Sequence, residues 1–434
     1  MQRDAGGTVV VVGGGWAGCA AALAAAKTGA QVTLLERSDM LLGTGLVGGI
    51  MRNNGRFTAT EESIALGGGE LFALTDANAR HTGIDFPSHR HASLYDIATT
   101  PGAVERLLKE RGVAVVFRAR VNDVLDSTGS HIESVTDDAG IDYSADVFID
   151  TTGTAGPMPN CIKYGNGCAM CVLRCPSFGG RVSVVALAGI VERQGSSKDG
   201  SLGAMSGSCK LHKESLAPDI VAQLETTGVA VVPLPEQLVE NHLDKKACQQ
   251  YATAEFAQNL VLLDTGHAKL MTPFYNLDTL HQVPGFQNAR YEDPYAGGKG
   301  NSMRYFALAP RDDSLKVEGI DNLFCAGEKA GLLVGHTEAI VTGTHAGYNA
   351  ARLLAGHAPV VLPTQTVIGD AITWVRTEMD APGGLSKKYT FSGSVLFERM
   401  KEQGSYTTDV ASIKARIEAL GLSGLYKDVE RVVS

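Results

Sequence analysis

Residues 9–37, VVVVGGGWAGCAAALAAAKTGAQVTLLER, hold each part of a dinucleotide-binding βαβ unit, in order and at the required spacing. The run of valines at 9–12 predicts a buried parallel strand, because such strands are apolar and β-branched throughout. It leads into Gly13, Gly15 and Gly18, the glycines of a G-x-G-x-x-G fingerprint. The first glycine permits a tight turn, and the second lets the backbone approach a pyrophosphate closely. The third lets a helix pack on the strand.

The rest of the unit supplies a helix and a carboxylate. The alanine-rich stretch 19–27 predicts a helix that Gly29 ends, with its N-terminal N–H groups and dipole facing the phosphates. A second strand over 31–35 leads to Glu36, whose carboxylate can accept hydrogen bonds from a ribose diol. With strand, helix, second strand and acid all present, the stretch predicts a bound dinucleotide.

Two distant segments favour FAD over a nicotinamide as that dinucleotide. Residues 141–153, IDYSADVFIDTTG, predict an apolar strand and resemble the strand and "ATG" turn of two-dinucleotide-fold flavoproteins. Residues 317–351 resemble the C-terminal FAD motif of the same superfamily, in which a short strand, here 323–326, precedes a helix with a face of small residues. That face consists of Ala339, Gly343, Ala346, Gly347 and Ala350. Beyond the fingerprint, we expect FAD contacts from Val121, Thr152, Gly153, Gly327, Glu328 and Thr337.

The predicted fold class is α/β, with a two-dinucleotide-binding-type FAD domain on a Rossmann-like parallel sheet, an inserted mixed α+β substrate domain and a small C-terminal helical region. We expect a discontinuous FAD-binding domain over 1–160 and 315–358, a substrate or cap domain over 161–314, and a helical extension over 359–434. The sequence has no second glycine fingerprint that opens a βα unit. NAD(P)H is therefore expected only as a transient electron donor that shares the flavin pocket.

The composition is that of a large enzyme. A chain of 434 residues is expected to form two or three domains. Its net charge of −9 gives no general basic field, so nucleic acid is a disfavoured partner, with a local basic patch left open. No run approaches the roughly 20 apolar residues of a membrane span, and the first residues, MQRDAGGT, show no signal peptide. We therefore expect a cytoplasmic protein without a membrane partner, and association into a homo-oligomer stays open.

Half of the eight cysteines fall within fifteen residues, in the pattern Cys161-x6-Cys168-x2-Cys171-x3-Cys175-Pro176. In a cytoplasmic protein such clustering indicates metal or redox chemistry more than structural disulfides. Several interpretations stay open. Cys161, Cys168, Cys171 and Cys175 could hold an iron–sulfur cluster or a zinc ion, the last three could provide a thiol redox pair or a catalytic nucleophile, or all four could be ordinary buried cysteines.

Several polar side chains are further candidates for chemistry. Lys329 and His336 fall in the C-terminal FAD motif, where a side chain can reach the N1 and C2 carbonyl edge of a flavin, so both are predicted as catalytic residues. Arg174 and Arg181 could fix a substrate carboxylate or form surface ion pairs. The run His89-Arg90-His91 is interpreted as a polar surface turn, with a proton donor or an anion site as the alternative.

The C-terminal half resembles the folate- and FAD-dependent tRNA uracil methyltransferases. Residues 284–310 resemble that family's P-G-L-E-N-A segment, 322–351 its N-L-F-x-A-G…G-Y-x-E-S-x-x-x-G-x-x-A-G-x-N-A motif, and 362–369 its P-x-x-T-A-x-G. Matching positions in the second motif are Glu338, Gly343, Gly347 and Asn349. The resemblance implies an FAD scaffold and, as one activity, methylation of uridine in RNA.

Two features favour a different primary hypothesis. Residues 41–56 contain no cysteine where that family has one, and the cysteine cluster 161–175 has no counterpart in its pattern. The predicted function is therefore an FAD-dependent oxidoreductase that acts on a small molecule, or on a thiol or metal redox partner such as a redox protein, in a pocket over the flavin. The alternatives are a folate- and FAD-dependent RNA uridine methyltransferase relative and a non-catalytic flavin- or metal-binding scaffold.

Overall fold

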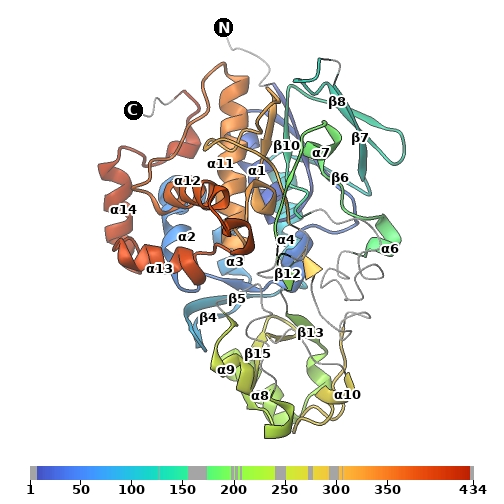
Figure 1. Cartoon of the computed structure of the whole chain (residues 1–434), viewed down its shortest axis with the longest axis vertical. Coiled ribbons are helices and arrows are strands. Elements are labelled where there is room, and N and C mark those ends of the chain that lie inside the picture. Colours follow the sequence, from blue (N-terminus) through green and yellow to red (C-terminus); the bar gives the residue numbers. More distant parts are fainter. Residues whose placement is uncertain are drawn as a thin grey trace.

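The structure, a computed structural model, describes residues 7–126, 128–154, 174–196, 200, 204–205, 208–239, 251–271, 277–292, 303–304 and 306–430. Within these residues, five parallel strands form a central sheet in the order β19-β10-β1-β2-β6 (Figure 1). The strands are β1 (Thr8–Val12), β2 (Gln31–Glu36), β6 (Ala114–Phe117), β10 (Val147–Asp150) and β19 (Leu323–Cys325). The predicted Rossmann-like sheet is confirmed, since segments far apart in the sequence lie side by side in it.

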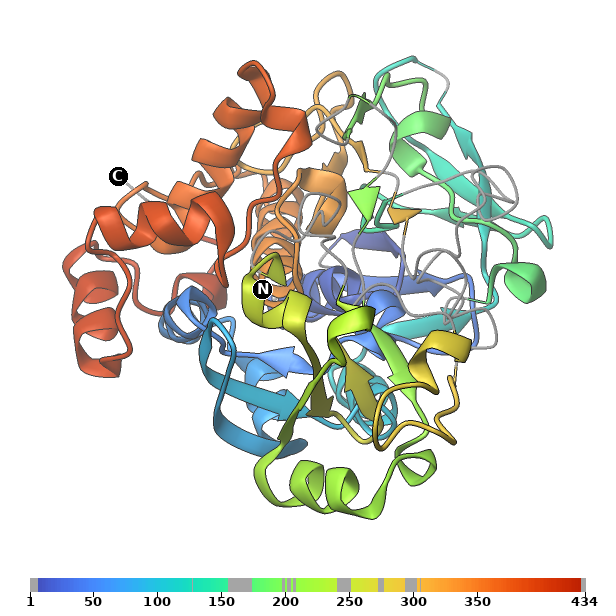
Figure 2. The same cartoon turned by 60° about the horizontal axis from the view of Figure 1, so that its bottom comes forward.

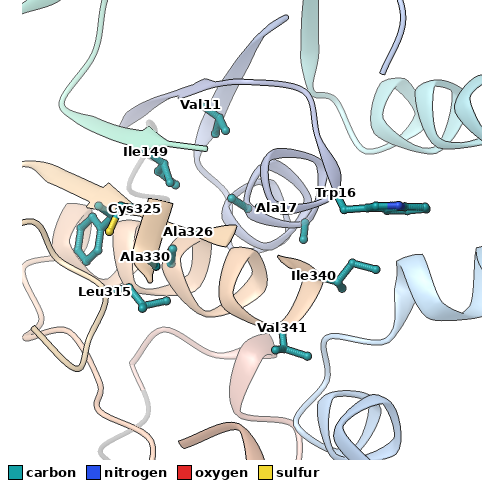
Figure 3. Close-up of a cluster of buried hydrophobic side chains, with 14 of the residues drawn as sticks. Val11, Trp16, Ala17, Ile149, Leu315, Cys325, Ala326, Ala330, Ile340 and Val341 are labelled. Carbon is teal, nitrogen blue, oxygen red and sulfur yellow. The ribbon is translucent and has the colours of Figure 1, made fainter. Parts of the chain in front are cut away.

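Helix packing on this sheet follows the predicted βαβ unit. Helix α1 (Trp16–Lys27) joins β1 to β2 and begins three residues before the predicted start. The long helix α11 (His336–Leu354) packs along α1, and α4 (Thr100–Glu110) contacts α1 and β6. Side chains of β1, β10 and β19 gather with Ala17 of α1 and Ile340 of α11 in one core (Figure 3).

Two glycines set the distance between α1 and α11. A Cβ atom added to Gly343 would lie 2.2 Å from the carbonyl oxygen of Ala17, and one added to Gly347 would lie 2.1 Å from that of Ala21. Both obstacles are helix backbone, which cannot move aside as the end of a flexible side chain can. The small-residue face expected on this helix is therefore used for close helix packing.

The predicted single strand over 141–153 is wrong, because this segment forms two strands in different sheets. Its polar first half, β9 (Asp142–Ser144), is part of an antiparallel sheet β7-β8-β9 with β7 (Val121–Leu125) and β8 (Ser134–Asp137). Its apolar second half is β10, which is buried along its whole length. Asp146 stands at the switch, where its carboxylate accepts hydrogen bonds from the N–H and hydroxyl of Thr8 at 2.7 and 2.8 Å.

A second unit, at the bottom of Figure 1, combines two small sheets. One is the antiparallel sheet β13-β16-β15-β14, and the other is β3-β5-β4. Their strands are β13 (Cys209–Leu211), β16 (Ala268–Leu270), β15 (Asn259–Asp264), β14 (Val229–Pro233), β3 (Ile50–Met51), β5 (His89–Tyr95) and β4 (Ala79–Phe86). Phe86 and Leu94 of the hairpin share a buried cluster with Val261 and Leu263 of β15, and Figure 2 shows the two sheets side by side. The hairpin 79–95 lies outside the elements predicted from the sequence.

The C-terminal residues form the predicted helical region, beside α2 on the left of Figure 1. Its helices are α12 (Val367–Asp380), α13 (Ser394–Glu402) and α14 (Val410–Ala419), and α2 spans Gly55–Ala65. Glu62 of α2 is fully buried, and its carboxylate accepts hydrogen bonds from the N–H groups of Val367 and Ile368 at the start of α12 and from Arg416 of α14. One acid thus stabilises a helix N-terminus and joins three helices.

Six further α-helices and two pairs of short strands lie elsewhere in the described part of the chain. They are the helices α3 (Glu70–Ala77), α6 (Cys175–Phe178), α7 (Val184–Leu187), α8 (Pro218–Thr227), α9 (Ala254–Gln258) and α10 (Leu277–Leu280), and the paired strands β11 (Arg193–Gln194) with β18 (Ala307–Leu308) and β12 (Ala204–Met205) with β17 (Met303–Arg304). Among the helices in the described ranges, none combines the length and the apolar character needed to cross a bilayer.

We predict that Gly343→Ala and Gly347→Ala each destabilise the protein by about 1–3 kcal/mol, because the added methyl group meets helix backbone. Gly102→Ala in α4 is the matched control, since its nearest neighbouring atom is a side-chain nitrogen of Arg106 at 3.7 Å. There alanine is expected to stabilise by up to about 1 kcal/mol through its helix propensity. Urea unfolding measures the free energy of unfolding of the three variants. If Gly343→Ala and Gly347→Ala stabilised the protein as Gly102→Ala does, the result would contradict the close packing of α1 and α11.

Candidate functional site

A cavity of about 220 Å³ lies at the carboxyl ends of the parallel strands. Its volume is more than ten times the ~10–15 Å³ that one water requires, so the cavity can hold a ligand. Val12, Leu35 and Ala326, at or next to the ends of β1, β2 and β19, contribute to its lining. Ligands of open α/β sheets bind at this edge, so the cavity is the candidate functional site.

The glycine fingerprint has the geometry that a bound pyrophosphate needs. Gly13 has a φ of +106° and leads into the turn, while a Cβ atom at Gly18 would lie 1.8 Å from the carbonyl oxygen of Gly13. Gly15 lines the cavity, and a Cβ atom built there has no other atom within 4 Å. The space beside Gly15 is thus open for a ligand to approach the backbone, next to the N-terminus of α1.

Glu36 lies in the cavity wall and fixes the loop around it. One carboxylate oxygen accepts a hydrogen bond from the N–H of Gly14 at 2.8 Å. The other accepts from the N–H and hydroxyl of Ser38 at 2.8 and 2.7 Å. The oxygen that accepts from Gly14 has a second lone pair, so this carboxylate can also accept a hydrogen bond from a ribose hydroxyl group.

The other predicted FAD contacts divide into two groups. Val121, Thr152, Gly153, Gly327 and Glu328 line the cavity together with Gly13, Gly15 and Glu36. Glu328 accepts a hydrogen bond from the hydroxyl of Thr154 at 3.0 Å, which holds the two strand ends together. Gly18 and Thr337 are outside the lining residues, and the fully buried Thr337 hydroxyl lies 3.7 Å from the sulfur of Met51.

The predicted catalytic residues are placed differently from one another. His336 lines the cavity at the start of α11. Lys329 is fully buried outside the cavity lining, where its Nζ pairs with Glu192 and donates to the carbonyl oxygen of Ala307 at 3.2 Å. Lys329 is therefore placed to hold the structure together, away from the space that a ligand can enter.

Only one residue of the predicted cysteine cluster can be placed. Cys161, Cys168 and Cys171 lie outside the described residues. Cys175 begins α6 and is half-buried, with its sulfur 3.9 Å from a guanidinium nitrogen of Arg37. In the part of the chain that the structure covers, no three His, Cys, Asp or Glu side chains are grouped as metal ligands. The iron–sulfur, zinc and thiol interpretations all stay hypotheses.

The cavity lining also includes Arg56 and Lys269, which the sequence analysis did not single out. Both are buried. The Nε of Arg56 donates to the two oxygens of Glu338 at 3.1 and 3.0 Å. Glu338 also accepts from the hydroxyl of Thr390 at 2.6 Å and from the N–H of Phe391 at 2.9 Å. The position of Glu338 in the C-terminal FAD motif was one signal for this network, whereas its partner Arg56 carries no motif.

The interpretation of His89 as part of a polar surface turn, or as a proton donor, is wrong. His89 is fully buried between the rings of Phe86 and Tyr251, with centroid distances of 4.6 and 5.0 Å. Its Nδ1 accepts a hydrogen bond from Asn53 at 3.0 Å. Burial, and then the charge of Arg56, lowers the pKa of His89 to about 3. His89 is therefore a neutral packing residue at physiological pH.

These features define a class, an FAD-dependent flavoprotein built on a two-dinucleotide-type fold. Residues 8–275 and 265–358 match the family model described as GIDA, glucose inhibited division protein A. The chain belongs to the GIDA family. The predicted superfamily and fold class are thereby confirmed, and FAD is the cofactor that the family and the cavity support. Neither NAD(P)H nor an iron–sulfur cluster has such support.

Individual relatives agree with this assignment. A stretch of 101 residues is 36% identical to the methylenetetrahydrofolate–tRNA-(uracil-5-)-methyltransferase TrmFO of Bacillus cytotoxicus. That match spans 23% of this chain and 22% of the relative. GidA of Aquifex aeolicus has the same fold in two crystal forms. The form II structure has a TM-score of 0.61 and 16% sequence identity, and the match covers 98% of this chain and 73% of that chain. The form I structure has a TM-score of 0.60 and 15% sequence identity, and the match covers 95% of this chain and 78% of that chain.

We predict that Glu36→Ala weakens FAD binding by about tenfold or more, because it removes charge-assisted hydrogen bonds to the loop and an acceptor for the ribose. Glu318→Ala is the control, since Glu318 is an exposed acid outside the cavity lining. Titration of the apo variants with FAD, followed by flavin fluorescence, measures both affinities. Equal affinity of Glu36→Ala and wild type would contradict the role of Glu36.

A second prediction concerns the pH dependence of stability. An unfolded histidine has a pKa near 6.5, whereas that of buried His89 is about 3. Below about pH 6.5 the unfolded chain takes up a proton that the folded state refuses, so stability is lost as the pH falls towards 3. We expect His89→Gln to flatten this loss in urea unfolding between about pH 7 and pH 5. His91→Gln, at an exposed position, should keep the wild-type slope, and a wild-type slope in both variants would contradict the prediction.

Proposed function

We propose that this chain is an FAD-dependent enzyme that modifies a uridine in RNA. The observation that carries the proposal is the match of residues 8–358 to the GIDA family, supported by the 36% identity to a tRNA uracil methyltransferase over 101 residues. This alternative agrees better with the relatives than the primary hypothesis of a small-molecule oxidoreductase does. The chain's own cavity, with a dinucleotide cradle on one side and the small sheets on the other, supports a flavin reaction on a second bound molecule.

A group of arginines beside the cavity supports an RNA partner despite the acidic chain. Five arginines, named here the arginine rim, belong to neighbouring segments at or next to the cavity: Arg37, Arg118, Arg120, Arg174 and Arg181. Arg37 and Arg118 directly follow β2 and β6, so they stand at the carboxyl ends of the sheet. Arg37 and Arg181 also line the cavity.

Hydrogen bonds tie the arginine rim to the segment 174–181. Arg37 donates to the carbonyl oxygen of Gly179, and Arg120 donates to that of Gly180 at 2.8 Å. Two acids, Asp39 and Asp138, pair with Arg174 and Arg120. Hydrogen bonding to Arg174 and the nearby charge of Arg118 lower the pKa of Asp39. The arginine rim thus places several guanidinium groups beside the cavity, and such groups would bind the phosphates of RNA.

The mechanism assigns binding and orientation to the chain. FAD would supply the redox chemistry when bound. The loop of Gly13 and Gly15 would bind its pyrophosphate, and Glu36 would bind its ribose. Arg56, held by Glu338, keeps its guanidinium group in the wall of the cavity near the start of α11. The arginine rim would position the RNA backbone so that a single base reaches the cavity.

The test of this proposal is a uridine-modification assay. Holoenzyme is incubated with an unmodified transfer-RNA transcript, with and without methylenetetrahydrofolate. The RNA is then digested, and the masses of its nucleosides are measured by mass spectrometry. We expect one uridine per transcript to gain mass. Unchanged nucleosides, together with turnover of the flavin by a small substrate in the absence of RNA, would contradict the proposal and favour the small-molecule oxidoreductase.

We further predict that the double variant Arg118→Ala/Arg120→Ala weakens RNA binding and reduces the slope of log affinity against log salt by about 2, one for each lost phosphate contact. Arg90→Ala/Arg290→Ala is the matched control, since both of its arginines are well exposed, pair with Asp85 and Glu214, and lie outside the cavity lining. Gel-shift titrations at several salt concentrations measure both slopes. Equal slopes for the two double variants would rule out the arginine rim as the RNA contact.

A further inference from the structure

A short segment, residues 174–181, borders the cavity, and we name it the strap. Its last residue, Arg181, lines the cavity, as does Val182, which follows it. Glu36 and Arg37, at the end of β2, line the same cavity, and Arg37 donates a hydrogen bond to the strap. The strap therefore lies at the end of the cavity where Glu36 would bind the ribose of FAD.

Two arginines outside the strap hold its middle. Arg37 donates to the carbonyl oxygen of Gly179, and the Nε of Arg120 donates to that of Gly180 at 2.8 Å. Asp138 accepts two hydrogen bonds from Arg120, at 3.0 and 3.2 Å, and so fixes the direction of its side chain. Hydrogen bonds from a charged donor are stronger than those between neutral groups. The middle of the strap is thus attached firmly to the rim of the cavity.

Each end of the strap has an anchor of its own. At the end, Arg181 donates to the carbonyl oxygen and the hydroxyl of Thr154 at 2.6 and 2.9 Å. At the start, Arg174 forms an ion pair with Asp39, and its guanidinium lies 4.9 Å from the ring centre of Phe178. The side chains of Arg174 and Asp39 are 38% and 37% exposed, so salt screens their attraction. The start is therefore the weaker of the two attachments.

The strap lies close to Arg120 because Gly179 has no side chain. Gly179 has a φ of +76°, and a Cβ atom added there would lie 2.7 Å from the Nε of Arg120. This Nε is the atom that donates to Gly180, which is buried. A methyl group at position 179 would push the arginine side chain aside and break that hydrogen bond. One contact of the strap can thus be removed by the smallest possible substitution.

The strap is built so that it can open while the rest of the fold stays intact. Its helix, α6, has four residues and lies at the right edge of Figure 1. Within the described residues, the strap pairs with no strand of a sheet. Segments held by few contacts open at a small cost in free energy. A ligand covered by such a segment leaves when the segment opens, so opening can limit its release.

We propose that the strap is a clamp that closes over the adenosine end of bound FAD and sets the rate at which FAD dissociates. Arg120 and Asp39 are positioning residues, since each holds the strap and neither lines the cavity. The proposal depends on FAD as the cofactor and is independent of the RNA substrate.

The test measures how fast FAD leaves the holoenzyme. Holoenzyme loaded with isotope-labelled FAD is mixed with an excess of unlabelled FAD, and the labelled FAD that stays bound is followed over time. Two variants loosen the clamp at different places. Gly179→Ala displaces Arg120, and Asp39→Asn removes the charge that pairs with Arg174.

Each variant has a matched control. Gly189→Ala introduces the same backbone strain, since Gly189 has a φ of +78°, but a Cβ atom there has no other atom within 4 Å. Asp85→Asn removes another exposed acid that pairs with an arginine, Arg90, outside the cavity lining. Urea unfolding establishes that every variant is folded.

We expect Gly179→Ala to raise the dissociation rate of FAD by about tenfold, because a charge-assisted hydrogen bond of the closed clamp is lost. Asp39→Asn should raise it by about two- to fivefold, since an exposed ion pair is worth less. High salt should accelerate release from wild type more than from Asp39→Asn, which has no ion pair left to screen. Gly189→Ala and Asp85→Asn should release FAD at the wild-type rate.

Cys175 reports the position of the strap directly. It is half-buried, and its sulfur lies 3.9 Å from a guanidinium nitrogen of Arg37. Cleavage after arginine releases residues 175–181 as a peptide with this single cysteine. Mass spectrometry of that peptide measures how fast an alkylating reagent reaches the thiol. We expect bound FAD to slow the alkylation in wild type, and Gly179→Ala to weaken this protection.

Two results would overturn the proposal. One is that Gly179→Ala and Asp39→Asn release FAD as slowly as their controls, and the other is that Cys175 is alkylated equally fast with and without FAD. If Gly179→Ala does not fold, Asp39→Asn and its salt dependence decide the question. The uridine-modification assay is a separate test, because FAD release and thiol alkylation are both measured without RNA.

Discussion

The close contact between α1 and α11 is the constraint on which the rest of the structure depends. Without side chains at Gly343 and Gly347, α11 packs directly on the backbone of α1 at Ala17 and Ala21. The same helix pair carries the phosphate-facing fingerprint at one start and His336 at the other. Segments separated by more than 300 residues are thereby brought to one edge of the parallel sheet. The cavity is a consequence of this packing, because its lining residues come from both helix starts.

A second level of organisation couples the cavity to the C-terminal helices. Glu338 begins this connection on α11, where it is fully buried and accepts hydrogen bonds from Arg56 and from the N–H of Phe391. Removal of one partner would leave a buried charge unpaired, which costs far more than the loss of an exposed ion pair. The C-terminal region thus helps to hold the wall of the cavity, in addition to burying α2 through Glu62.

The predictions from sequence were successful where the signal was local. The βαβ unit, its glycines and Glu36 follow from residues adjacent in the chain, and the structure places all of them as a dinucleotide cradle would require. The strand 141–153 failed because its polar half and its apolar half pair in different sheets, which depends on partners far away in the sequence. His89 and Lys269 could not be assigned for the same reason. A histidine between two polar neighbours and a lysine in a short strand give no sign that tertiary packing will bury them.

The most direct test of the central claim is an experimental structure of the holoenzyme bound to a uridine-containing RNA. The account predicts FAD density along Gly13 and Gly15 with its ribose at Glu36, a phosphate backbone on the arginine rim, and one pyrimidine ring in the cavity. RNA density on another face of the protein, with a cavity that holds no base, would contradict it.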